Sequence, residues 1–141
     1  MFFTTEEKSV IVQSIADAET ETSGEIRVHI EPKCKEDVMD RAAYIFKKLE
    51  MHKTDLRNGV LIYIAVEDRK FAILGDVGIN VKVPKDFWDQ VKETMKSHFV
   101  QNNYVDGLSE GIRIIGTQLK SYFPYMENDK NELSNEISFG A

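Results

Sequence analysis

The sequence is poor in cysteine, proline and tryptophan: its 141 residues include one cysteine, three prolines and one tryptophan. With Cys34 as the sole cysteine, no internal disulfide can form, and zinc sites built from cysteine pairs are excluded. A chain without disulfides suits a reducing compartment, so we expect a cytoplasmic protein.

Long apolar runs and an excess of positive charge are also absent. No stretch reaches the roughly 18 apolar residues that span a bilayer, and the N-terminal segment lacks the basic and apolar regions of a signal peptide. The formal net charge of −6 repels phosphate backbones and anionic membrane surfaces. We therefore expect a soluble monomer that neither binds nucleic acid nor inserts into a membrane.

Common catalytic motifs are missing as well. The three histidines are isolated from one another and from Cys34, which argues against a zinc site. Arg41 lies one residue too far from Cys34 for a Cys-x5-Arg phosphate loop. Gly75-Asp-Val-Gly78 lacks the lysine of a phosphate-binding loop, and we interpret its glycines as positive-φ positions where a strand turns toward a helix. No catalytic residue can be named, so the sequence leaves open whether the protein is an enzyme.

What is present is the composition and periodicity of one globular domain. The chain is 42% hydrophobic and 30% charged, and its length suits a single core. Apolar residues recur at helical spacing in four segments and at strand spacing in three. We predict helices over residues 4–19, 36–51, 84–100 and from the turn at 101–104 to Tyr122, and strands over residues 25–30, 60–66 and 71–74.

The order of these elements predicts an α/β fold. Strand, helix and strand give a parallel pair with a right-handed crossover, and the short segment 67–70 predicts a hairpin. The strand at 60–66 is apolar on both faces, which is typical of a strand covered on both sides by helices. We expect a three-layer α/β/α sandwich with a small mixed sheet in residues 1–124, followed by a polar C-terminal tail in residues 125–141.

Three aspartates fall near the carboxyl ends of the two parallel strands, where open α/β sheets usually bind ligands. Asp68 lies in the hairpin turn, Asp37 at the start of the second helix, and Asp106 after the third helix. Carboxylate oxygens are the ligands that Ca²⁺ and Mg²⁺ prefer. The sequence thus predicts Asp37, Asp68 and Asp106 as metal ligands, although each residue type is also common in turns and helix caps.

A second polar cluster is expected at the opposite end of the sheet. The hairpin places Asp76 beside the starts of the other two strands, and therefore near Glu25, Arg57 and Asn58. This cluster is an alternative binding site, unless Arg57 does no more than neutralise Asp76.

Several short segments follow one another along the chain: Ser23-Gly-Glu-Ile26, Thr54, Arg57-Asn-Gly-Val-Leu61, Asp68, Ala72-Ile-Leu-Gly-Asp-Val-Gly-Ile79, Phe87-Trp-Asp89 and Phe123-Pro124. Taken in order, these segments resemble the TPM domain, which thylakoid lumen proteins of photosystem II repair share with many bacterial proteins. They span roughly residues 4–124, and the chain resembles a short stand-alone bacterial version. The resemblance implies an α/β/α sandwich with a small mixed sheet. Plant members of the family are associated with acid phosphatase activity and with binding of divalent cations, calcium in particular, and other members with assembly or repair of membrane complexes.

The leading hypothesis is therefore a non-enzymatic module that binds a divalent cation, with calcium favoured over magnesium. One alternative is a metal-assisted acid phosphatase in which Asp68 takes part. Another is a protein-interaction or complex-assembly domain that uses Trp88 or the tail aromatics as its anchor. The sequence names neither a substrate nor a protein partner.

Overall fold

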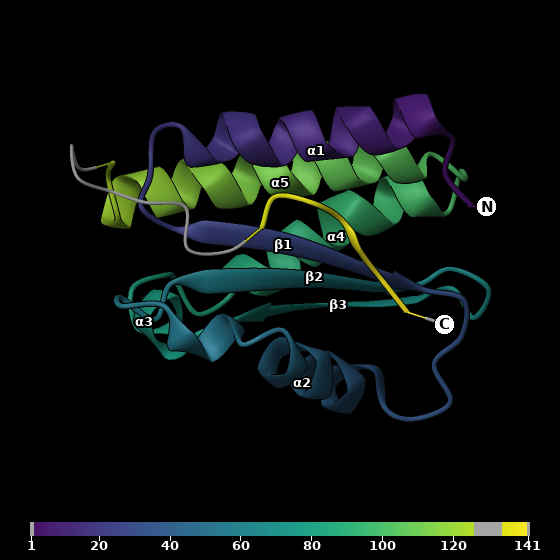
Figure 1. Ribbon diagram of the computed structural model, residues 1–141, viewed down its shortest axis with the longest axis horizontal. Helices are drawn as coiled ribbons and strands as arrows, with labels where there is room; N and C mark the ends of the chain where they lie inside the picture. The colour runs from purple at the N-terminus through teal and green to yellow at the C-terminus, as the bar shows by residue number, and fades with distance from the viewer. Residues whose placement is uncertain (1, 126–133, 141) are drawn as a thin grey trace.

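The computed structural model describes residues 2–125 and 134–140 (Figure 1). Within these residues the chain forms α-helices, one short 3-10 helix and four strands. The strands are β1 (Glu25–Glu31), β2 (Gly59–Ala65), β3 (Lys70–Gly75) and β4 (Ser138–Phe139). The helices are α1 (Thr5–Glu19), α2 (Val38–Lys48), α3 (Val77–Asn80), α4 (Phe87–Phe99) and α5 (Tyr104–Tyr122), with the 3-10 helix η1 at Met51–Lys53.

The sheet is mixed and has the order β3-β2-β1-β4. β1 pairs in parallel with β2, with Glu25 opposite Gly59, and β3 returns antiparallel to β2, as predicted. β4 was not predicted: it adds a short parallel strand at the free edge of β1, where His29 lies opposite Ser138. Part of the segment expected as a polar tail therefore pairs with the sheet.

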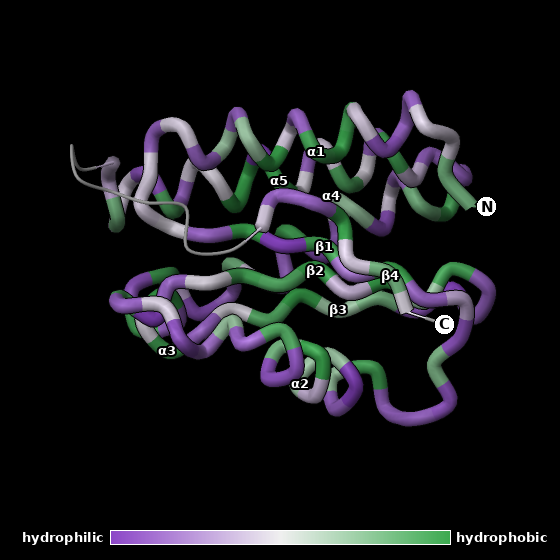
Figure 2. Tube along the Cα trace, in the orientation of Figure 1, coloured by the Kyte–Doolittle hydropathy of each residue, from purple (hydrophilic) through white to green (hydrophobic). Residues whose placement is uncertain are grey.

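Helices cover both faces of the sheet, which confirms the predicted three-layer α/β/α arrangement. Figure 1 shows α1, α4 and α5 on one face and α2 on the other. The larger core lies under α1, α4 and α5 and includes Ile26, Ile62 and Ile112, whereas a smaller core under α2 includes Leu61 and Ile45. Figure 2 shows the apolar and polar residues alternating along α1, as a helix with one buried face requires.

Local signals explain most helix boundaries. Thr4 and Glu7 form a capping box, in which each side chain accepts the backbone N–H of the other. α2 ends at Lys48, three residues earlier than predicted, because Glu50 has a left-handed backbone with φ of 59°.

The interpretation of Gly75 and Gly78 was wrong. No described glycine has a positive φ. Both glycines are instead required by close packing, since a Cβ at Gly78 would collide with the carbonyl oxygen of Leu56 and one at Gly75 with the ring of Trp88. The positive φ expected at these glycines occurs in the same region at Arg57, with φ of 52°.

None of the helices in the described part of the chain has the length and apolar character that crossing a membrane would require.

Candidate functional site

The predicted aspartates at the carboxyl end of the sheet have separate local roles. Asp68 lies in the β2–β3 turn, where its Oδ2 accepts the backbone N–H of Cys34 at 2.8 Å. Asp37 caps α2, with Oδ1 accepting the backbone N–H groups of Met39 and Asp40. All three predicted aspartates, including Asp106, are exposed to solvent.

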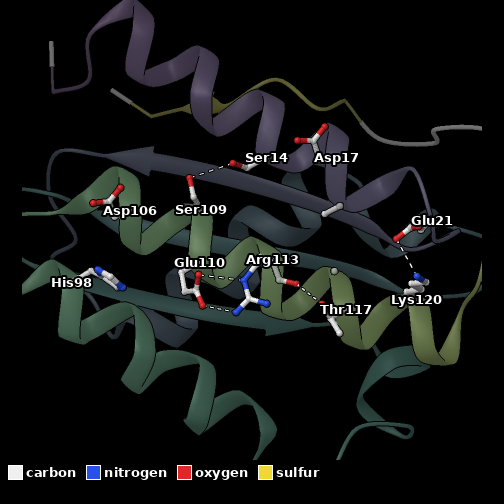
Figure 3. Close-up of a pocket in the computed structure, with 12 residues that line it drawn as sticks. Ser14, Asp17, Glu21, His98, Asp106, Ser109, Glu110, Arg113, Thr117 and Lys120 are labelled. Carbon is white, nitrogen blue, oxygen red and sulfur yellow. Dashed lines mark hydrogen bonds and ion pairs between the residues drawn. The ribbon is translucent and has the colours of Figure 1, made fainter.

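Asp106 lies in the first turn of α5, on the opposite face of the sheet from α2 (Figure 1). It lines an open groove of about 700 Å³ over α1 and α5. Figure 3 shows Asp106 and His98 at one end of this groove and the Glu21–Lys120 ion pair, 3.1 Å long, at the other. The fold therefore does not bring Asp106 together with Asp37 and Asp68.

No group of three or more histidine, cysteine, aspartate or glutamate side chains in residues 2–125 and 134–140 is arranged to hold a metal ion. A cation site within these residues would therefore need at least one neutral oxygen ligand, such as an asparagine amide or a backbone carbonyl.

The second predicted cluster, at the amino end of the parallel strands, does come together. Arg57 donates from Nε and Nη2 to the two carboxylate oxygens of Asp76, at 2.7 and 2.8 Å. This bidentate pair raises the pKa of Arg57 through its hydrogen bond to Asp76. It also holds the left-handed backbone of Arg57, a conformation that costs of order 1–3 kcal/mol and is enriched at functional sites.

Glu25 and Asn58 adjoin this pair and are almost completely buried, with 2% and 1% of their surfaces exposed. The backbone N–H of Glu25 donates to the carbonyl oxygen of Asn58 at 3.4 Å, so the two residues start their strands side by side. Among the described residues, neither amide atom of Asn58 has a hydrogen-bond partner, and the same holds for the buried hydroxyl of Thr54. Leaving such groups unsatisfied costs about 1–3 kcal/mol each, which makes the position unusual for a purely structural asparagine.

A residue that the sequence reasoning missed, Glu19, completes the cluster. Its Oε2 accepts the backbone N–H of Ile26 at 2.7 Å, next to Glu25. Burial, and to a smaller extent the negative charge of Glu25, raise the pKa of Glu19 to about 8, although the hydrogen bond from Ile26 opposes the shift. Glu19 therefore holds a proton at neutral pH.

The sequence did carry a signal for Glu19. Ile11 and Ile15 form the buried stripe of α1, and Glu19 is the next residue on that stripe, four positions further along. A carboxylate on the apolar face of a helix is unusual and marks either a buried partner or a ligand site.

The loop between α1 and β1 is fixed by the end of α5. Ser23 donates its backbone N–H to the carbonyl oxygen of Phe123 at 2.9 Å, and Tyr125 donates to Glu21 at 3.0 Å. Thr22 also donates its hydroxyl to Phe123. Glu19 and Glu25, on either side of this loop, are thus held in place before any ligand binds. We call Glu19, Glu25 and Asn58 the amino-end cluster.

A different buried network, also missed from the sequence, lies at the other end of β1. Glu31 accepts hydrogen bonds from Arg41 at 2.6 and 3.1 Å, from the hydroxyl of Tyr63 at 2.6 Å and from Nε2 of His29 at 3.1 Å. Burial alone would raise the pKa of Glu31, but these bonds outweigh it and lower the pKa to about 2. His29 also bonds Ser138 through Nδ1 at 2.8 Å, so we call these five residues the carboxyl-end network.

Trp88, a proposed anchor for a protein partner, packs against the larger core. Its indole N–H donates to Oδ1 of Asn80 at 2.9 Å, and its ring lies 5.0 Å from that of Phe87. The hydrogen bond to Asn80 ties α4 to α3.

Comparison with known proteins agrees with this fold. The family model of the TPM domain matches residues 1–118. The NMR structure of BA42 protein from the psychrophilic bacterium Bizionia argentinensis is similar over 99% of this chain and 97% of that chain, with 50% sequence identity and a TM-score of 0.93. No protein in the curated set matches significantly.

Two more distant structures share the fold at low identity. The N-terminal domain of a P. gingivalis protein has 18% identity and a TM-score of 0.69, covering 86% of this chain and 79% of that chain. The N-terminal domain of cg2496 protein from Corynebacterium glutamicum has 13% identity and a TM-score of 0.66, covering 83% and 74%. From the family match over most of its length and the 50% identity to BA42, this chain belongs to the TPM domain family.

Proposed function

We propose that the protein is a divalent cation-binding domain, with calcium favoured, and that the amino-end cluster is its site. The observation that carries the proposal is the buried Asn58 amide, which has no hydrogen-bond partner among the described residues. Asn58 lies beside Glu25 at the start of the neighbouring strand, and the pKa of the Glu19 carboxyl near Glu25 is raised to about 8. A cation would use the amide oxygen as a ligand and would remove the cost of bringing two negative charges together.

The donor set favours Ca²⁺ over Mg²⁺. Two carboxylates and one amide supply up to five oxygens when both carboxylates bind in a bidentate manner, and backbone carbonyls or water can complete the six to eight ligands of calcium. Mg²⁺ demands nearly ideal octahedral geometry, which a cluster fixed by the α1–β1 loop cannot readily adopt.

Binding at this site is coupled to proton release. Because the pKa of Glu19 is raised to about 8, a cation that binds at pH 7 must displace the proton from that carboxyl group. The apparent affinity should therefore rise between pH 6 and pH 8 and level off above the pKa of Glu19.

Calorimetric titration of the whole chain with CaCl₂ tests the proposal. We expect saturable binding at pH 7 whose heat depends on the ionisation enthalpy of the buffer, because a proton is released. Amide NMR shifts should centre on Ile26 and Asn58. No heat and no shifts at millimolar calcium would rule out the function.

Variants locate the site. Glu19→Gln should weaken binding at least tenfold, while Glu21→Gln, on an exposed residue two positions away, should leave it unchanged. Asp68→Asn tests the cluster at the other end of the sheet. If Asp68→Asn loses calcium binding and Glu19→Gln retains it, the cation site lies at Asp37 and Asp68 instead.

A further inference from the structure

A small apolar pocket lies at the end of the sheet opposite the amino-end cluster. The end of β2 and the start of β3 form its floor, and the end of α4 and the start of α5 form its wall. Its volume is about 190 Å³. Ligands of open α/β sheets usually bind outside the carboxyl ends of parallel strands, which is where this pocket opens.

Aromatic rings pack against one another in the lining of the pocket. The ring of Phe99 packs edge-on against that of Phe71, with centroids 4.9 Å apart, and stacks on that of Tyr104 at 5.2 Å. The aliphatic lining comes from Ile64, Val66 and Val100. Val100 is 67% exposed although it is apolar, so one side of the pocket presents an uncovered hydrophobic surface.

The rim of the pocket is positively charged. Arg69, Lys70 and Lys96 line it, and its lining includes no acidic residue, although the chain as a whole carries a net charge of −6. Lys70 donates to the carbonyl oxygen of Cys34 at 3.3 Å. Within the described part of the chain, the side chains of Arg69 and Lys96 form no ion pair, so both are available to an anion.

We propose that this pocket binds a small amphipathic carboxylate, with its apolar body against Phe71 and Phe99 and its carboxylate between Arg69 and Lys96. A pocket of 190 Å³ is smaller than the roughly 300–1,000 Å³ of drug-sized sites, so the ligand is small. It has room for roughly six groups of the volume of a water molecule, about 30 Å³ each, which matches a short acyl chain or a single aromatic ring. This inference is independent of the proposed cation site.

Titration with sodium hexanoate, followed by amide and methyl NMR, tests the inference, with calcium present in one series and absent in another. We expect saturable shifts at Ile64, Phe71, Phe99 and Val100, with a dissociation constant of about 0.1–1 mM. Hexanol shares the apolar body without the charge and should bind at least fivefold more weakly. Acetate shares the charge without the body and should produce no saturable shifts at these residues.

Two exposed valines at helix ends provide a matched pair of variants. Val100 caps the C-terminus of α4 in the pocket wall, and Val81 caps the C-terminus of α3 and is 78% exposed. Val100→Asp should weaken hexanoate binding at least tenfold by repelling the carboxylate, whereas Val81→Asp should leave it unchanged. Lys96→Gln should weaken binding about threefold to fivefold.

Either of two results would overturn the inference. One is the absence of saturable shifts at the pocket residues up to 20 mM hexanoate. The other is equal binding of hexanoate and hexanol together with no effect of Lys96→Gln, which would show that the rim does not select an anion. Because calcium is varied separately, loss of cation binding and loss of hexanoate binding are distinguishable.

Discussion

The two ends of β1 each carry a buried glutamate, and the surroundings of the two residues are opposite. Glu31 accepts hydrogen bonds from Arg41, Tyr63 and His29, and its pKa falls to about 2. At the other end Glu25 adjoins Glu19, whose pKa rises to about 8, and Asn58, whose amide has no partner among the described residues. The same strand thus stabilises a negative charge at one end and opposes it at the other.

The difference in hydrogen bonding distinguishes a cluster that stabilises the fold from a cluster that is a candidate binding site. A buried polar network that is fully hydrogen-bonded holds elements together, and the carboxyl-end network joins β1, β2, α2 and β4. A buried cluster with unsatisfied groups weakens the fold by itself, so its presence indicates a ligand that removes the cost. For this reason we assign the proposed cation site to the amino end.

The largest effect is expected from removing the centre of the carboxyl-end network. Glu31→Ala leaves the buried hydroxyl of Tyr63 and the ring of His29 without their acceptor and leaves Arg41 unpaired. We expect a loss of about 3–5 kcal/mol in the free energy of unfolding, measured by urea denaturation. Glu31→Gln should recover part of this loss, since its amide oxygen still accepts one hydrogen bond.

Glu110→Ala is the control, because Glu110 forms a surface ion pair with Arg113. This variant should lose about 0.5 kcal/mol in the free energy of unfolding. The pH dependence gives a second check. The pKa of Glu31 in the folded protein lies below its ordinary value of 4.5. The contribution of Glu31 to the free energy of unfolding is therefore complete above pH 4.5 and is lost as the pH falls toward 2. Equal losses of unfolding free energy in Glu31→Ala and Glu110→Ala would show that the carboxyl-end network does not stabilise the fold.

The second prediction concerns Glu19, for which the sign of the pH dependence is reversed. Its folded pKa of about 8 exceeds its ordinary value of 4.5, so the folded state keeps a proton that the unfolded state has lost. Without calcium, stability should fall by about 2–3 kcal/mol as the pH rises from 5 to 8, and then level off. Urea denaturation at a series of pH values measures this slope.

Glu19→Gln should remove the slope, and Glu21→Gln should retain it. Excess calcium should also reduce it in the natural sequence, because a cation at the proposed site would be bound most tightly when both carboxylates are ionised. A slope that persists in Glu19→Gln would assign the proton to another residue.

The third prediction compares two asparagines. Asn58→Leu removes an amide that has no partner in the described structure, so the variant without metal should be more stable by about 1–2 kcal/mol and should no longer bind calcium. Asn80→Leu removes an amide that donates to Gly75 and accepts from Trp88, and it should be less stable by about 1 kcal/mol. Thermal unfolding with and without CaCl₂ measures both. Destabilisation of similar size in the two variants would show that Asn58 is a structural residue.

Local sequence patterns predicted most of the fold. The apolar stripe of α1, the two-faced apolar strand β2 and the short β2–β3 turn each determine structure within a few residues, and all three elements formed as expected. β4 was not predicted because its strand is two residues long and depends on pairing with β1 across more than one hundred positions. Short segments whose structure depends on distant partners carry no periodic signal.

The candidate site was only partly predictable for a related reason. Arg57, Asn58 and Asp76 lie at turns next to strand ends, so topology alone brought them together with Glu25. Glu31 was harder to interpret, because apolar and polar residues alternate along β1, and this pattern is typical of a strand whose polar face is exposed. The neighbouring strand β2 is buried on both faces, and this implies that the polar face of β1 is also partly covered.

The smallest effect is expected where the carboxyl-end network meets β4. Ser138→Ala removes the hydrogen bond to His29 and nothing else in the network, so it should cost about 0.5–1 kcal/mol. The loss should appear as local opening, with faster hydrogen exchange at the Gly140 amide, which donates to the carbonyl oxygen of Ile30 at 2.8 Å. Ser9→Ala, on the exposed face of α1, should leave that exchange rate unchanged. If exchange at Gly140 is equally fast in both variants and in the natural sequence, the His29–Ser138 bond does not hold β4, and backbone pairing with β1 is sufficient to keep this strand in place.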